Sequence, residues 1–190
     1  MKIILGSQSK GRRKMLESMG YEFEVMSSDI DEKAIRFDDP RVLTLALANA
    51  KADALLARIH EAAILITADQ VVAWNGTIRE KAENEREARE YLRSYAAHPA
   101  ETVAAVVVVN TATKKRQEGV DIARVFFRAI PENVIDEIVS EEDIFSRAGA
   151  FSVEDPRLKH YIKRIEGTID SVIGLPKKLT QRLIDEVRVP

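Results

Sequence analysis

An apolar run from Thr102 to Val109 restricts the possible folds more than any other feature of this chain. After its threonine the run contains only valine and alanine. Valine favours strands, and near-continuous apolar runs are typical of strands that are covered on both faces. The run therefore predicts a buried strand, and we expect it to pair with a second strand over 120–128.

The rest of the hydrophobic pattern mixes strands and helices without strict alternation. Further strands are expected over 2–5, 22–26, 63–67 and 71–74. Asp69 is expected to break the chain between the last two strands, and Asn75-Gly76 is expected to form a hairpin turn. Helices are expected over 10–19, 40–59, 85–95 and 131–139, and after Pro176. The pattern predicts an α/β fold with a long mixed sheet and flanking helices, formed by one domain over 1–190 or by two tightly joined lobes.

Composition excludes several classes of protein. The chain has no cysteine, which rules out disulfides, thiolate catalysis and cysteine-based zinc sites. A net charge of −2 and only 6% aromatic residues disfavour a nucleic-acid partner. No apolar run is long enough for a membrane span or a secretory signal, so we expect a cytoplasmic protein without a membrane partner. His60, His98 and His160 have no metal-binding spacing, and we expect them to be surface or structural residues.

The first loop gathers small hydroxyls and cations where a helix is expected to begin. It contains Ser7 and Ser9, followed by Lys10, Arg12 and Arg13. Free N–H groups at a helix start and nearby cations suit a phosphate group. The loop alone is equally compatible with a capped helix whose basic first turn is solvated. Neither the P-loop pattern nor the dinucleotide-binding glycine pattern is present.

Two acidic residues are candidates for catalysis and metal binding. Asp69 stands among apolar, strand-forming residues, where a carboxylate is costly unless it has a partner or a function. It could bind a metal or deprotonate water, or it could shape a turn between strands. Glu32 ends an acidic run. Considered by itself, it is best interpreted as a solvated loop residue or a helix cap. Together with Asp69 it could bind Mg²⁺ or Mn²⁺, which take a few carboxylates plus phosphate and water.

Lys51 and Lys81 are candidates for a second layer of positive charge. Lys51 lies at the edge of the apolar face of the 40–59 helix, so its stem could cover the core while its amine reaches a cleft. Each lysine alone is more readily explained as a solvated side chain. Together with Arg12 and a metal ion, they could neutralise a triphosphate, and phosphoryl transfer needs little beyond such neutralisation and a positioned water.

Six stretches resemble, in order, the motifs of the Maf (septum formation protein) family of nucleoside triphosphate pyrophosphatases. Residues 5–12 resemble the family's opening L-A-S-x-S-P-R-R, and 30–32 its V-D-E. Residues 48–52 resemble A-x-x-K-A, and 68–72 followed by 80–81 resemble A-D-T-V-V and E-K-P. Residues 148–151 resemble K-A-G-A-Y, and 167–176 resemble G-S-x-x-x-V-x-G-L-P. These matches cover nearly the whole chain.

The resemblance implies two lobes around a central cleft and a fold related to inosine triphosphate pyrophosphatase. A homodimer is a further expectation from the family. It implies metal-dependent hydrolysis between the α- and β-phosphates, which yields a nucleoside monophosphate and pyrophosphate. Asp69 matches the residue regarded as the proton acceptor that activates water. The residues that match the phosphate and metal region are Ser7, Arg12, Glu32, Lys51 and Lys81.

Departures from the family pattern bear on the substrate. Gln70 and Glu154 are similar to the branch that prefers 7-methyl-GTP, whereas the dTTP/UTP branch carries threonine and glutamine. A carboxylate at position 154 could accept hydrogen bonds from N1–H and the exocyclic amine of guanine. Gly11 stands where the 7-methyl-GTP branch has tryptophan, and Lys10 replaces a proline. We expect the substrate to be 7-methyl-GTP or a related purine triphosphate. The alternative for the chain is a dTTP/UTP pyrophosphatase, and the alternative for Glu154 is a loop carboxylate without a role in recognition.

A third hypothesis is a non-catalytic regulator of cell division that binds a nucleotide. The paired carboxylates Glu32 and Asp69 argue against it, because a binding protein has no need of them.

Overall fold

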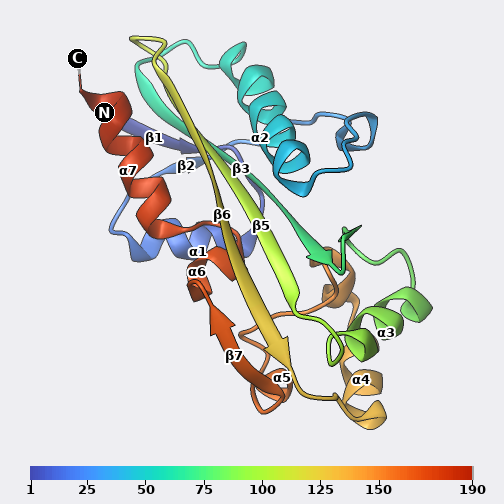
Figure 1. Ribbon diagram of the computed structural model, residues 1–190. Helices are drawn as coiled ribbons and strands as arrows, with labels where there is room; N and C mark the ends of the chain where they lie inside the picture. Colours follow the sequence, from blue (N-terminus) through green and yellow to red (C-terminus); the bar gives the residue numbers. More distant parts are fainter. Residues whose placement is uncertain (190) are drawn as a thin grey trace.

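The computed structural model describes residues 1–189 and has a mixed sheet at its centre (Figure 1). The sheet has seven strands in the order β2-β1-β3-β5-β6-β7, with β4 paired to β3. β1 is parallel to β2 and β3, and the other pairs are antiparallel. The strands are β1 (Lys2–Leu5), β2 (Glu24–Val25), β3 (Ala63–Trp74), β4 (Thr77–Arg79), β5 (Ala100–Asn110), β6 (Arg116–Phe127) and β7 (Ile162–Glu166).

Helices cover both faces of this sheet, as predicted. The α-helices are α1 (Lys10–Ser18), α2 (Pro40–Leu56), α3 (Glu85–Ser94), α4 (Glu132–Val139), α5 (Pro156–Lys159), α6 (Ile169–Ile173) and α7 (Lys177–Arg188). The short 3-10 helices are η1 (Glu32–Ala34) and η2 (Glu142–Ser146). Pro190, the last residue of the expected 1–190 domain, lies outside the described residues.

The valine-rich strand β5 is buried on both faces, as its sequence predicts. Ala105, Val107 and Val109 share a hydrophobic cluster with α2, whereas Val106 and Val108 share one with α1 and α7. Alternate residues of a strand point to opposite faces, so these two helix layers lie on opposite sides of the sheet, as Figure 1 shows. At the other end of the strand, Ala100 joins a cluster that includes residues of α3 and α4.

The predicted break at Asp69 is wrong, because β3 is one continuous strand. The Cα of Asp69 pairs with that of Ala105 on β5, within an uninterrupted antiparallel ladder. The carboxylate is accommodated by a side-chain partner rather than by a turn, as described below. The hairpin turn at Asn75-Gly76 is confirmed. Both turn residues have positive φ, 47° and 80°, which the tight turn between β3 and β4 requires.

Other predicted boundaries need smaller corrections. The strand expected over 22–26 shortens to β2, both of whose residues are exposed, and the helix from Pro40 ends at Leu56 rather than near 59. β6 begins at Arg116, before the expected residue 120, and β7 was not predicted because its sequence is rich in charge. All three histidines are exposed, as expected for surface residues. Within residues 1–189, no helix combines the length and apolarity needed to cross a membrane.

Candidate active site

One cavity of about 1030 Å³ is lined by the site residues that the sequence proposed, with the exception of Arg13. The lining residues include Ser7, Ser9, Gly11, Arg12, Glu32, Lys51, Asp69, Gln70, Lys81 and Glu154. They come from the loop before α1, the start of α1, η1, α2, β3, the segment after β4 and the turn before α5. The fold therefore brings together side chains that are up to 147 positions apart, from Ser7 to Glu154.

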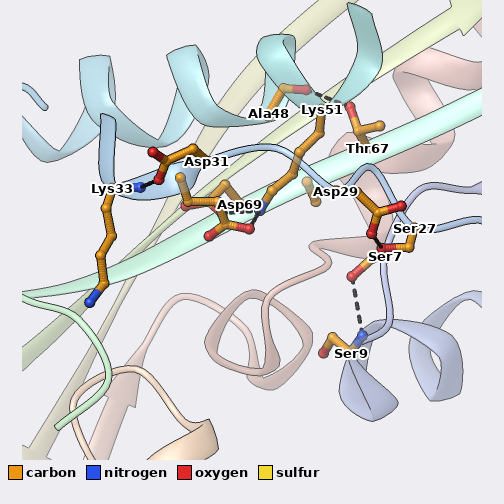
Figure 2. Close-up of polar contacts among 12 residues, drawn as sticks. Ser7, Ser9, Ser27, Asp29, Asp31, Lys33, Ala48, Lys51, Thr67 and Asp69 are labelled. Carbon is orange, nitrogen blue, oxygen red and sulfur yellow. Dashed lines mark hydrogen bonds and ion pairs between the residues drawn. The ribbon is translucent and has the colours of Figure 1, made fainter. Parts of the chain in front are cut away.

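At the wall of the cavity, Lys51 on α2 forms ion pairs with two carboxylates. Its Nζ lies 2.6 Å from Oδ1 of Asp69 on β3 and 3.0 Å from Oε1 of Glu32 in η1. Figure 2 shows the Lys51 side chain extending from the helix to Asp69. The side chains of Lys51 and Asp69 are each only 8% exposed, whereas that of Glu32 is 52% exposed. A buried charge needs a partner, which explains how Asp69 is tolerated within a strand.

The neighbouring contacts fix the relative position of α2 and β3. Thr67 is fully buried, and its hydroxyl donates a hydrogen bond of 2.8 Å to the carbonyl oxygen of Ala48 (Figure 2). Thr67 lies two residues before Asp69 on the same face of β3, and Ala48 lies three before Lys51 on α2. This hydrogen bond therefore holds the helix against the strand next to the ion pair.

Glu32 and Asp69 are suitable ligands for a divalent cation that is shared with a phosphate. Both carboxylates contact the same ammonium group, so their oxygens converge on one small region. Within residues 1–189, no group of three or more His, Cys, Asp or Glu forms a complete metal cage. Mg²⁺ is usually held by one or two carboxylates together with substrate phosphates and water. The two carboxylates fit that role.

The first loop is held together by hydrogen bonds to its two serines. Oγ of Ser9 caps α1 by accepting from the N–H of Arg12 at 3.4 Å. Oγ of Ser7 accepts from the N–H of Ser9 and from Nη1 of Arg12, both at 3.2 Å (Figure 2 draws the first). The capped-helix interpretation is thus correct for Ser9, yet both serines also line the cavity.

Arg12 connects this loop to two other segments of the cavity wall. Its Nη1 donates to the carbonyl of Ala68 at 2.9 Å, and its Nε donates to the carbonyl of Gly174 at 3.0 Å. Burial lowers the pKa of Arg12, and the charges of Asp69 and Glu32 act in the opposite direction. Because an arginine pKa starts so high, the guanidinium keeps its positive charge at neutral pH.

Lys81 is exposed, unlike Lys51, but its backbone is fixed. It forms an isolated antiparallel bridge with Ala148, and the N–H of Gly149 donates to the carbonyl of Glu80 at 2.8 Å. Gly149 has a φ of 67°, and a Cβ at this position would lie 2.7 Å from the Tyr95 hydroxyl. A glycine is therefore required where this segment meets the core beside Lys81.

Glu154 lies in a turn before α5 and lines the cavity. It forms an ion pair that the sequence did not predict. Its Oε1 is 2.5 Å from Nζ of Lys14 on α1, and both side chains are well exposed, at 44% and 62%. The two residues are 140 positions apart, so no local pattern could have predicted the pair. An exposed pair of this kind contributes little to stability, which leaves Glu154 free to exchange partners.

Gln70 and Gly11 both contact the short helix α6. Nε2 of Gln70 donates to the carbonyls of Ser171 at 3.2 Å and Val172 at 2.9 Å. A Cβ at Gly11 would lie 2.8 Å from Cγ2 of Ile173. Ile173 also lines the cavity, although the sequence gave no reason to single it out.

Comparison with known proteins adds independent information. The family model described as Maf-like protein matches residues 2–187. A 7-methyl-GTP pyrophosphatase from Dictyostelium discoideum is 47% identical over 97% of this chain and 96% of its own. A dTTP/UTP pyrophosphatase from Pelotomaculum thermopropionicum is 34% identical over 92% and 90% of the two chains. A crystal structure of a dITP/XTP pyrophosphatase from Mycobacterium abscessus aligns over 99% of this chain and 96% of that one, with 12% identity and a TM-score of 0.43. At that score, the expected relation to the inosine triphosphate pyrophosphatase fold stays a prediction.

Proposed function

The chain belongs to the Maf-like protein family, and from that premise we propose that it hydrolyses nucleoside triphosphates between the α- and β-phosphates. The products are a nucleoside monophosphate and pyrophosphate. The observation that carries this proposal is the buried pair of Lys51 and Asp69, which lies at the wall of a cavity large enough for a nucleotide. Relatives named as nucleotide pyrophosphatases cover almost the whole chain, which supports the same reaction class.

Asp69 is the proposed general base. Its carboxylate accepts a proton from the water that attacks the α-phosphorus, and the ion pair with Lys51 holds it in place for that task. Because Asp69 lies within the continuous ladder between β3 and β5 and its side chain is only 8% exposed, the carboxylate has little freedom to move away. Lys51 stays next to the reacting phosphate, where its charge stabilises the transition state.

The remaining cavity residues bind the triphosphate. Arg12 and Lys81 contribute positive charge from separate segments of the lining, and the hydroxyls of Ser7 and Ser9 donate hydrogen bonds to phosphate oxygens. Glu32 and Asp69 hold the proposed Mg²⁺ or Mn²⁺, which when bound supplies further neutralisation of phosphate charge. The division of the chain into two lobes around this cavity and a homodimeric assembly belong to the same proposal.

The preferred substrate in this proposal is 7-methyl-GTP or a related purine triphosphate. Glu154 accepts hydrogen bonds from the N1–H and exocyclic amine of the base after it separates from Lys14. The 47% identity to a 7-methyl-GTP pyrophosphatase supports this choice over the dTTP/UTP alternative, whose named relative is 34% identical.

Product analysis tests the reaction and its metal requirement together. With Mg²⁺ or Mn²⁺, the purified protein should convert its best triphosphate into monophosphate and pyrophosphate in equal amounts. EDTA should abolish turnover, and excess Mg²⁺ should restore it, because the divalent cation held by the carboxylates neutralises part of the phosphate charge. Release of orthophosphate would show that the bond assignment is wrong. Nucleotide binding without turnover would favour a non-catalytic regulator instead.

Glu154→Gln tests the assignment of base recognition. An amide can both donate and accept, so it suits uracil, whose single N–H lies between two carbonyls. We expect the ratio of kcat/KM for 7-methyl-GTP over UTP to fall by about tenfold or more, in line with the loss of one polar contact in a specific pocket. The matched control is Glu141→Gln, which changes an exposed carboxylate outside the cavity lining that pairs with Arg157. An unchanged substrate profile in Glu154→Gln would remove this residue from substrate selection.

A further inference from the structure

The segment 171–174, at the end of α6, receives hydrogen bonds from two separate candidate residues. Gln70 donates to the carbonyls of Ser171 and Val172, and Arg12 donates to the carbonyl of Gly174. Gly174 has a φ of 104°, and a Cβ there would lie 2.6 Å from Oε1 of Gln70. The NH2 group of Gln70 is therefore used in fixing the backbone of this segment, and its Oε1 lies close to Gly174.

The side chain held by these contacts is Ile173. It is partly buried, it packs against two hydrophobic clusters that contain Phe151 and Leu175 respectively, and it lines the cavity. Its Cγ2 lies next to Gly11. A Cβ atom added to residue 11 would lie only 2.8 Å from this Cγ2, which is too close for two carbon atoms. Ile173 thus fills the space beside α1 that a side chain at position 11 would otherwise enter.

Ile173 and Glu154 are both adjacent to one face of α1. Gly11 and Lys14 are three residues apart on this helix and so share a face. Gly11 lies against Ile173, whereas Lys14 contacts Glu154. An apolar surface and a carboxylate are therefore presented to the cavity from neighbouring positions, and a nucleobase needs both: an apolar contact for its flat face and an acceptor for its edge.

We propose that Ile173 is the apolar surface against which the base of the bound nucleotide packs, and that Gln70 is a positioning residue that fixes Ile173 through the carbonyls of α6. This inference rests on the proposed nucleotide substrate and assigns the part of the cavity that receives the base. It also changes the expected role of Gln70, from contacting the base to holding the residue that does.

The test compares Ile173→Ala with Ile169→Ala. Ile169 is a matched control on the same helix, because this residue is 56% exposed and does not line the cavity. Binding of 7-methyl-GTP in EDTA, which prevents turnover, and of inorganic tripolyphosphate, which has no base, is measured by calorimetry. Ile173→Ala should weaken nucleotide binding by about tenfold, as expected for lost apolar contact in a pocket, and leave tripolyphosphate binding unchanged. Ile169→Ala should change neither.

The Gln70→Ala variant tests the positioning role. It should also weaken nucleotide binding, and the double variant with Ile173→Ala should be no weaker than Ile173→Ala alone, because both changes remove the same contact. Additive losses would show that Gln70 acts on the base independently.

The inference and the proposed function can fail separately. If Ile173→Ala binds 7-methyl-GTP normally, or loses tripolyphosphate equally, the base does not pack on Ile173, whatever the wild-type protein hydrolyses. If the wild type binds 7-methyl-GTP through Ile173 but releases no pyrophosphate with metal, the proposed reaction is wrong and the base site stands. If the wild type neither binds the nucleotide in EDTA nor releases pyrophosphate from it with metal, both are overturned.

Discussion

Asp69→Asn should lower kcat/KM for the best triphosphate by about a thousandfold, within the range that a general base contributes. The amide has the shape of the carboxylate but cannot accept the proton of the attacking water. Lys51 keeps its contact with Glu32, 3.0 Å away, so the charge on the buried ammonium remains paired. Pyrophosphate release measures the activity, and circular dichroism and thermal unfolding should show that the variant is folded.

The matched control is Asp53→Asn, which changes an exposed aspartate on α2 that pairs with Arg116 outside the cavity. This variant should hydrolyse nucleotides at the wild-type rate. If a folded Asp69→Asn protein keeps a tenth or more of the wild-type kcat/KM, Asp69 is not the base.

Lys51→Met should destabilise the protein by about 3 kcal/mol, because removal of one partner leaves the buried Asp69 carboxylate without its counter-charge. Methionine preserves most of the apolar stem, so little packing volume is lost. Chemical denaturation measures the free energy of unfolding, and the activity should be lost as well. Lys178→Met, on the exposed surface of α7, is the control and should change stability by no more than about 0.5 kcal/mol.

A double variant separates stability from catalysis at this pair. Lys51→Met combined with Asp69→Leu removes both charges, and replacement of a buried ion pair by apolar residues is often neutral or stabilising. The double variant should recover most of the stability lost in Lys51→Met and have no activity. If it is as unstable as the single variant, the loss comes from packing around Lys51 rather than from an unpaired charge.

The sequence predicted the elements whose patterns are long and regular. The apolar run from Thr102 to Val109 predicted β5, and the Asn75-Gly76 dipeptide predicted the turn between β3 and β4, because both depend on local side-chain chemistry. β7 and the short helix α6 were missed, since brief segments owe their structure to what they pack against.

The error at Asp69 has a clear physical origin. A lone carboxylate in an apolar stretch suggests an interruption when only neighbours in sequence are considered. Its partner Lys51 is 18 residues away on a helix, so the pairing that keeps β3 continuous becomes visible only in three dimensions. The same limit applies to Glu154 with Lys14 and to Gly11 with Ile173, whose contacts join opposite ends of the chain.

The two central strands have a consequence for how the molecule responds to damage. β3 and β5 each contribute residues to all four hydrophobic clusters. If one cluster loses its packing, a strand that the other three clusters share is loosened. We therefore expect the chain to unfold as one cooperative unit. A weakened core remote from the cavity therefore reduces the number of folded molecules, while each molecule that remains folded keeps an unaltered site.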